Sequence, residues 1–467
     1  MNAGKLPGGL PAAIVALLPA SLLAASALAA PRNKPRAPTP SPAPAAGTAT
    51  MASPRDITLV LTGGPGQRNP IAIPVPVAPI DPEMQSKIAD PFFTALTDDL
   101  GSSPAILVAD PALYPRGLRP PATREEGDVW IATSAQYLLD TRIQRAGDQI
   151  EVIAQLYDLK TLRSRLGRSY RGEPRAARKI AHTLANDIVR EFTGKPGPFL
   201  TKIAYVSDRD ELGVKEIYVM DFDGQNPVRL TYNRSLSLSP DWSPDSTHLV
   251  YQLYQSDTAR LATLARDGSE KKVVATPTEL NSSPSWSPDG KTIAFCGSVK
   301  GNTEIFTVNT DGSGLKRLTE NAAIDSTPRW SPNGREIAFT SNRQGLPQIY
   351  LMDLEGANVR RVTFAGTWND EAAFSPDGQR LAFACRNEGD MQICVMNILT
   401  GQTVQISTGP GSHENPTWSP EGSRLAWEVT RGSSTQIVVG NADGSGAARA
   451  ITSQGNNFSP SWSKTLE

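Results

Sequence analysis

One aromatic position recurs through the C-terminal half of the chain at a fixed interval. It belongs to a motif of the type SPSWSPDG, seen at residues 283–290, and each occurrence lies 44 residues after the one before. A period of about 40–45 residues built from short strands is typical of a β-propeller blade. Six such anchor positions therefore predict six blades. The anchors are Trp242, Trp286, Trp330, Phe374, Trp418 and Trp462.

Each repeat contains the material for four strands. The anchor strand is followed by a Ser-Pro-Asp-Gly-type turn, an apolar run such as 293–295, a second run such as 305–307, an Asp-Gly turn and a third run. Short runs rich in β-branched and aromatic residues, separated by Asp-Gly turns, indicate antiparallel hairpins. Radial stacking of such sheets buries both faces of each sheet and leaves short, protected edges.

The two ends of the repeat array complement each other. The first unit, which begins at Ile203, has no anchor strand before it, and the last anchor, Trp462, has no further strand after it. We therefore predict that residues 458–462 supply the innermost strand of the blade begun by Ile203, which would close the ring.

The N-terminal 54 residues have the composition of an export signal and a linker. Residues 1–29 combine Lys5, an apolar stretch and an Ala-Leu-Ala site, so we expect a signal peptide cleaved after Ala29 and an exported protein. An uncleaved anchor is the alternative, disfavoured by Pro11, Pro19 and the high alanine content. Residues 30–54 are rich in proline and alanine, and predict a spacer or an arm that docks on another protein.

Residues 55–195 change character and predict an α/β domain, followed by the propeller over residues 196–467. Asp81 and Pro82 indicate the start of a helix, which Pro91 should kink or split. A final amphipathic helix over about 174–192 should stop at Gly194. The expected strands are Ile57–Leu61, Ile71–Val77, Ala105–Val108, Ala135–Gln144, Gln149–Leu156 and Leu162–Tyr170.

The chain lacks the motifs of several common enzyme classes. There is no phosphate-binding GK[ST] loop and no G-x-S-x-G nucleophile elbow. The three histidines, His182, His248 and His413, lie on different predicted elements and do not suggest a multi-histidine metal site. A formal net charge of −1 gives no indication of nucleic-acid binding. No cofactor and no further membrane span are expected, and the protein should be a monomer.

The chain has three cysteines, Cys296, Cys385 and Cys394. Cys385 and Cys394 flank a predicted hairpin tip and could face each other across adjacent strands. Directly opposed pairs are often strained, so we expect buried free thiols rather than a bridge.

The repeat also predicts where a partner binds. The short turns share one face of the ring, and the longer, variable connections share the other, where function normally resides. A polar residue five positions before each anchor should line the channel mouth on that second face, with Asp370 and Glu414 adding negative charge. Concave polar mouths are common binding places, either for a protein loop or for a cation. The candidate residues are Ser237, Asn281, Asp325, Asn369, Asp370, His413, Glu414 and Asn457.

The order of these parts resembles the TolB family of the Tol–Pal envelope system. The resemblance covers residues 55–467 and rests on the α/β domain with Ile180-Ala181-His182, the junction FTGKPG at 192–197, the strand KIAYVS at 202–207 and the six WSPDG-type blades. It implies a non-enzymatic periplasmic protein that binds the peptidoglycan-associated lipoprotein Pal at the propeller mouth. It also implies a link to TolA through the N-terminal arm, and a role in outer-membrane integrity and envelope constriction at division.

Two other classes of function remain open at this point. A propeller lyase or glycan hydrolase would need paired carboxylates or a metal cluster converging at the channel mouth, for which Asp325, Asp370 and Glu414 are the candidates. A glycan-binding module is the third interpretation.

Overall fold

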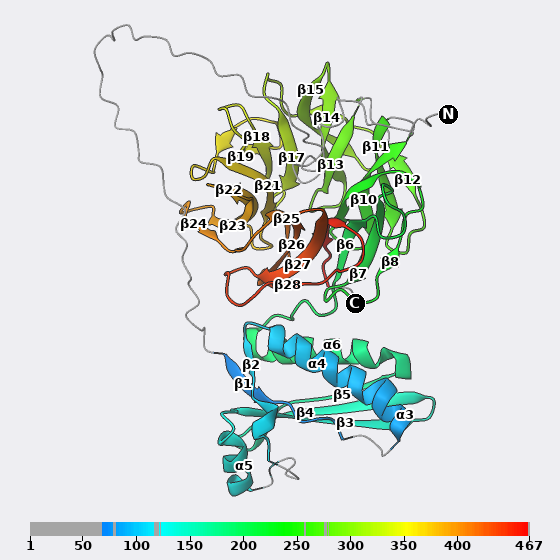
Figure 1. Ribbon diagram of the computed structural model, residues 1–467, viewed down its shortest axis with the longest axis vertical. Coiled ribbons are helices and arrows are strands. Elements are labelled where there is room, and N and C mark those ends of the chain that lie inside the picture. Colours follow the sequence, from blue (N-terminus) through cyan, green and yellow to red (C-terminus); the bar gives the residue numbers. More distant parts are fainter. Residues whose placement is uncertain are drawn as a thin grey trace, which may run out of the picture.

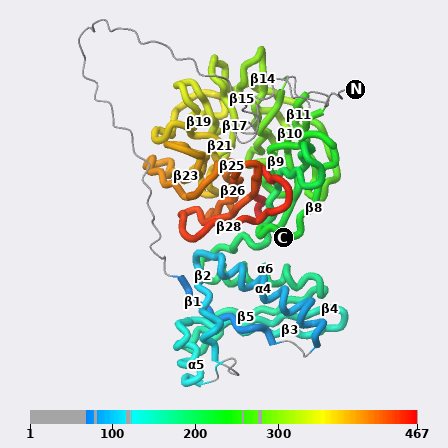
Figure 2. Tube along the Cα trace, in the orientation of Figure 1, coloured from blue at the N-terminus to red at the C-terminus, as the bar shows by residue number. Residues whose placement is uncertain are grey.

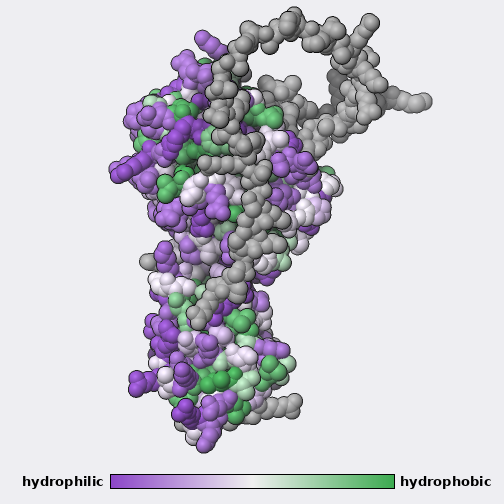
Figure 3. All heavy atoms as spheres, turned by 90° about the vertical axis from the view of Figure 1, so that its left-hand side faces the viewer, coloured by the Kyte–Doolittle hydropathy of each residue, from purple (hydrophilic) through white to green (hydrophobic). Residues whose placement is uncertain are grey.

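The computed structural model describes residues 68–77, 81–115, 121, 123–255, 258–274, 278 and 280–465. These residues form two stacked parts, an α/β domain and a β-propeller (Figure 1, Figure 2, Figure 3). The expected signal peptide, the Pro/Ala-rich segment and the strand Ile57–Leu61 lie outside the described residues.

The propeller consists of six four-stranded antiparallel sheets, which confirms the predicted fold. The first blade is β29-β6-β7-β8, and the other five use four consecutive strands each, with the anchor strand innermost. In the first three blades the strands are β29 (Asn457–Trp462), β6 (Lys202–Ser207), β7 (Glu216–Asp221), β8 (Val228–Arg229), β9 (Ser237–Trp242), β10 (His248–Gln255), β11 (Thr258–Ala265), β12 (Lys272–Val274), β13 (Asn281–Trp286), β14 (Thr292–Val299), β15 (Asn302–Asn309) and β16 (Lys316–Arg317). In the last three they are β17 (Asp325–Trp330), β18 (Glu336–Ser341), β19 (Gln348–Asp353), β20 (Arg360–Arg361), β21 (Trp368–Phe374), β22 (Arg380–Arg386), β23 (Gln392–Asn397), β24 (Thr403–Gln405), β25 (Ser412–Trp418), β26 (Arg424–Arg431), β27 (Ser434–Asn441) and β28 (Arg449–Ala450).

The ring closes as the sequence predicts. Strand β29 pairs antiparallel with β6, with Trp462 opposite Ile203 and Asn457 opposite Ser207. The Trp462 indole Nε1–H also donates to Thr201 Oγ1 at 2.7 Å, next to the start of β6. The two ends of the propeller therefore share one sheet and are also joined by side-chain hydrogen bonds, including Asn456 to Asp208 at 3.1 Å.

The anchor rings have the packing role that their spacing suggests. Trp242, Trp418 and Trp462 are each less than 8% exposed. The indole of Trp242 donates to the Ser461 carbonyl oxygen at 3.1 Å, and that of Trp418 donates to the Ala373 carbonyl oxygen at 3.0 Å. Since both acceptors lie on the preceding blade, these two anchors join neighbouring sheets as well as filling the core.

The N-terminal domain is a mixed sheet in the order β2-β1-β3-β4-β5. Strands β1, β2 and β3 are parallel, and β3, β4 and β5 form an antiparallel meander. Helices α4 and α6 lie between this sheet and the propeller (Figure 1). The elements are β1 (Asn69–Ala72), α3 (Pro82–Met84), η1 (Gln85–Ala89), α4 (Asp90–Ser102), β2 (Ile106–Val108), η2 (Pro111–Leu113), α5 (Arg124–Ile131), β3 (Tyr137–Ala146), β4 (Gln149–Asp158), β5 (Arg163–Gly172), η3 (Pro174–Ala176) and α6 (Ala177–Thr193).

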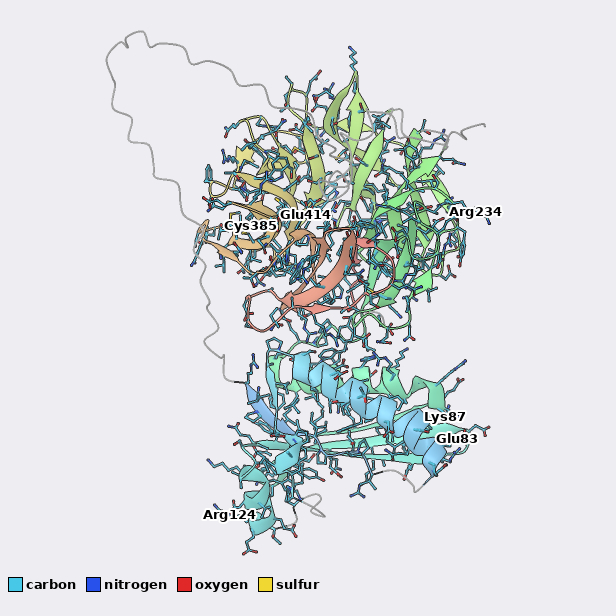
Figure 4. All side chains as sticks on the ribbon, viewed as in Figure 1. Glu83, Lys87, Arg124, Arg234, Cys385 and Glu414 are labelled. Atoms are coloured by element: carbon cyan, nitrogen blue, oxygen red, sulfur yellow. A yellow bond between two sulfur atoms is a disulfide. The ribbon has the colours of Figure 1, made fainter. Side chains whose placement is uncertain are left out.

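The helix expected at 82–100 is interrupted as Pro91 predicts. Asp81 caps its start by accepting the Glu83 N–H, and Glu83 pairs with Lys87 one turn later (Figure 4). A π-helical turn, η1, precedes Pro91, with the Asp90 N–H donating to the Gln85 carbonyl oxygen. The wider turn relieves the clash that a proline ring makes with the carbonyl four residues earlier.

The expectation of free thiols at Cys385 and Cys394 is wrong, because the two residues form a disulfide with Cα atoms 5.9 Å apart. The strand register explains the difference. Cys385 lies opposite Gln392, and Cys394 lies opposite Phe383, so the cysteines form a diagonal pair across β22 and β23. The Cα separation is the common one for a disulfide. Cys296 is a buried free thiol.

Candidate functional site

The N-terminal domain packs on only one face of the propeller. Arg424, which follows a Ser-Pro-Glu-Gly turn, donates to the Ser102 carbonyl oxygen at 2.7 Å, and Arg178 of α6 forms an ion pair with Asp223 of an Asp-Gly turn. Both propeller residues belong to the short turns, so we call this side the short-turn face. The opposite, long-loop face carries the longer connections and is left open by the N-terminal domain.

The six polar residues five positions before the anchors are buried. Their exposed fractions range from 0% to 4%, so the expectation that these side chains line an open mouth is wrong. They are Ser237, Asn281, Asp325, Asn369, His413 and Asn457.

These side chains instead hold neighbouring blades together at the long-loop end. Asn369 Nδ2 donates to Gln348 Oε1 on the preceding blade at 2.8 Å. Asn457 makes the equivalent bond to Gln436 at 2.9 Å, and Ser237 Oγ donates to Glu216 Oε2 at 3.2 Å. Asn281 reaches the preceding blade through the Ala259 carbonyl oxygen at 2.9 Å.

Asp325 and His413 make their side-chain hydrogen bonds within their own blades, and His413 Nε2 has no partner among the described residues. Asp325 accepts two hydrogen bonds from Arg343 at 3.0 and 3.1 Å. His413 Nδ1 accepts the Trp427 indole N–H at 3.0 Å, and burial, followed by the nearby Arg431, lowers the pKa of His413 to about 4. His413 is therefore neutral at physiological pH.

Two of the predicted residues, Asp370 and Glu414, lie near enough to Glu371 for their charges to interact, and Glu371, which the sequence analysis missed, lines the channel cavity. Burial, followed by the charges of Glu414 and Asp370, raises the pKa of Glu371 well above its ordinary value. Burial and the neighbouring Glu428 raise the pKa of Glu414 to about 8 (Figure 4). Asp370 accepts the Thr340 hydroxyl at 2.7 Å and the Glu371 N–H at 2.7 Å. Asp325 lies apart from this group, bound to Arg343.

Glu371 belongs to a second ring of equivalent repeat positions, which lie three residues before each anchor. All six residues adopt a left-handed backbone with φ between 47° and 56°, where the pairing of the innermost strand shifts by a β-bulge. The bulge directs the six residues into the channel, where they line a cavity of about 650 Å³ that the anchors also border. They are Ser239, Ser283, Thr327, Glu371, Asn415 and Ser459.

The long-loop face presents large apolar side chains to solvent. Leu212 is 88% exposed, Tyr232 71% and Leu346 53%, all in connections of that face. Ile324 and Phe364 lie in equivalent connections and are also exposed. Large exposed apolar side chains on a face that the N-terminal domain leaves open are candidates for contacts with a protein partner.

The channel offers no preformed metal centre in the described part of the chain, where no group of three His, Cys, Asp or Glu side chains is placed to hold a metal ion. A cation remains a proposal for the carboxylates around Glu371, whose Oε1 is buried without a hydrogen-bond partner among the described residues.

Comparison with known proteins decides the family. A family model described as the TolB beta propeller domain matches residues 189–466, more than half of the chain. The chain belongs to the TolB propeller family. The resemblance predicted from the sequence is thereby confirmed.

Curated relatives and solved structures agree with this assignment. The chain is 34% identical over 189 residues to the Tol-Pal system protein TolB of Syntrophotalea carbinolica, covering 40% of this chain and 44% of that protein. It is 39% identical over 149 residues to the same protein of Geobacter sulfurreducens, covering 32% of this chain and 34% of that protein. The alignments thus span less than half of either relative. The crystal structure of TolB from Acinetobacter baumannii matches with a TM-score of 0.75 and 26% identity, over 86% of this chain and 98% of that chain. Within the described residues, no helix is both long and apolar enough to cross a bilayer.

Proposed function

We propose that the protein is a non-enzymatic, periplasmic scaffold of the Tol–Pal system. Its long-loop face binds the peptidoglycan-associated lipoprotein Pal, and its N-terminal segment links the complex to TolA. In this role it contributes to outer-membrane integrity and to envelope constriction during division. The names of the curated relatives and the match to a TolB structure across both domains support the proposal.

The observation that carries the Pal site is the contrast between the two faces of the ring. The N-terminal domain partly covers the short-turn face, where Leu399 stays exposed, and leaves the long-loop face open, with Leu212, Tyr232 and Leu346 exposed on it. Burying such side chains against a partner contributes about 25 cal/mol per Å² of apolar surface. The six buried polar residues hold the bases of these loops in place, and Asp370 and Glu414 lie next to this layer in the innermost strands.

The channel carboxylates fit a scaffold better than an enzyme. Asp370 is held by hydroxyl and backbone donors, and Glu371 Oε2 accepts the Asn415 N–H at 2.7 Å. These contacts fix the bulged strands, so a structural role accounts for both acids.

Capture of purified Pal, with its lipid anchor removed, tests the proposal. Wild-type protein should retain Pal, and Leu212→Asp/Leu346→Asp should lose retention at least about tenfold, because each charge would be buried at the interface. Leu315→Asp is the matched control, since Leu315 is 37% exposed in a short-turn connection. The proposal fails if wild type does not retain Pal, or if the control and the double variant behave alike.

A further inference from the structure

A cleft of about 730 Å³ lies where α6 meets the outer side of the first two blades. Its walls come from the first turns of α6, the chain at 199–202, blade one and the Asp-Gly turn at 266–267 of blade two. The volume is within the range of small-molecule sites. This cleft is separate from the channel and from the long-loop face.

The rim of the cleft carries an excess of positive charge. Five basic side chains line it, against the two acidic side chains of Asp221 and Asp267. Arg178 and Lys202 are used in ion pairs with propeller aspartates. The exposed side chains of Lys179 and Arg266 make no ion pair with any described residue, so their charges remain available. The five basic residues are Arg175, Arg178, Lys179, Lys202 and Arg266.

Two buried nitrogens of the cleft-lining residues also lack hydrogen-bond partners among the described residues. His182 is 5% exposed and its Nδ1 lies 2.6 Å from Asp99 Oδ2, while Nε2 is unpartnered. The Nε of Arg178 is likewise buried without a partner. Because both nitrogens are almost fully inaccessible, they lie beneath the cleft wall, and the exposed basic side chains are the groups that can meet a ligand.

The floor of the cleft is apolar. Phe199 and Leu230 are buried beneath it, and Val228 is 57% exposed at its edge. A ligand that filled the cleft would therefore meet cations at one end and hydrocarbon at the other.

We propose that this cleft binds an amphiphilic anion, whose carboxylate or phosphate head lies among Lys179, Arg178 and Arg266 and whose apolar part covers Val228 and Leu230. The site is independent of the proposed Pal face. Its ligand class is a small acidic amphiphile, with a fatty acid and a phosphate monoester of a fatty alcohol as the two chemical sources.

Calorimetric titration of the full chain with monomeric amphiphiles tests this inference. Decanoate and decyl phosphate are the probes, and they separate the two head groups. Inorganic phosphate alone should bind at least about tenfold more weakly, because it leaves the apolar floor uncovered. Decyltrimethylammonium should not bind, because its head repels the basic rim. At least one anionic probe should bind.

Two double variants test where the anion binds. Lys179→Gln/Arg266→Gln should weaken anion binding about tenfold or more, since each removed contact is charge-assisted. Lys160→Gln/Arg163→Gln, which removes two exposed charges from the turn after β4 and the first residue of β5, should leave binding unchanged. Equal binding by the two double variants would overturn the proposal. So would failure of both anionic probes, equal binding of the cationic amphiphile, or equal binding of inorganic phosphate.

Discussion

Replacing Trp462 measures how strongly the last strand closes the ring. The indole is 7% exposed, and it packs in the core shared by the first blade and the N-terminal domain. Burial of this order makes Trp462→Ala cost about 3–5 kcal/mol of unfolding free energy.

Trp462→Phe separates the hydrogen bond from the packing. It keeps an aromatic ring, which the repeat tolerates at Phe374, but it removes the donor to Thr201 Oγ1, an acceptor that is itself 2% exposed. Loss of this bond should cost about 1–2 kcal/mol, beyond a smaller cost for ring volume. Trp286→Phe is the matched control, because the Trp286 indole N–H has no partner among the described residues.

Urea unfolding followed by far-ultraviolet circular dichroism gives both values. The account predicts that Trp462→Phe is less stable than Trp286→Phe by about 1–2 kcal/mol, with an unchanged urea dependence for each. Equal costs for the two phenylalanine variants would refute the reasoning about the hydrogen bond. A cost below about 1 kcal/mol for Trp462→Ala would refute the closure itself.

Three other perturbations test separate parts of the structure, and a deletion tests the closure again. Replacing both Cys385 and Cys394 by serine should lower stability by about 2–3 kcal/mol, as expected for a short closed loop, and mass analysis should show that reduction adds two hydrogens to the wild type. Because the pKa of Glu414 is raised from 4.5 to about 8, its contribution to stability is complete below about 4.5 and is lost as pH rises through 8. As the pH rises from 6.5 to 8.5, the unfolding free energy of Glu414→Gln should therefore increase relative to that of the wild type. If the difference in unfolding free energy between the two proteins does not change with pH, the burial of this carboxyl is contradicted. Arg424→Ala removes hydrogen bonds to the N-terminal domain and should cost about 2–4 kcal/mol while leaving Pal capture intact, measured by urea unfolding and retention. Deleting residues 457–467 should unfold the ring in one transition, and a thermal melt like that of the wild type would argue against closure.

The repeat made most of the fold predictable. The 44-residue spacing of the anchors fixes the number of blades, and the unpaired first and last units predict the pairing of β29 with β6. In the N-terminal domain, local signals were enough for the Asp81 cap and the interruption before Pro91. These features succeed because spacing and backbone chemistry are local properties of the chain.

One helix was missed although its signal was present. Helix α5 starts at Thr123, whose hydroxyl accepts the Glu126 N–H, and the sequence Thr-Arg-Glu-Glu has the spacing of a capping box. The helix is only eight residues long, so its apolar periodicity is too brief to stand out.

The candidate site was harder to predict, because the polarity of a residue does not show which way its side chain points. The polar residues such as Asn369 lie at strand starts, where a side chain can face either the channel or the next blade, and the structure turns them toward the next blade. The channel-facing residues were marked by a proline that follows the bulge in five of the six repeats, as at Pro240 and Pro284. Proline inside a strand is typical of a bulge, so this pattern identifies the ring that contains Glu371.

Hydrogen–deuterium exchange with and without Pal is the most direct test of the proposed scaffold role. The account predicts protection in the long-loop connections, chiefly 208–215, 342–347 and 386–391, with no change in the short turns at 222–226 and 310–315. Protection confined to the short turns, or none at all at saturating Pal, would contradict it.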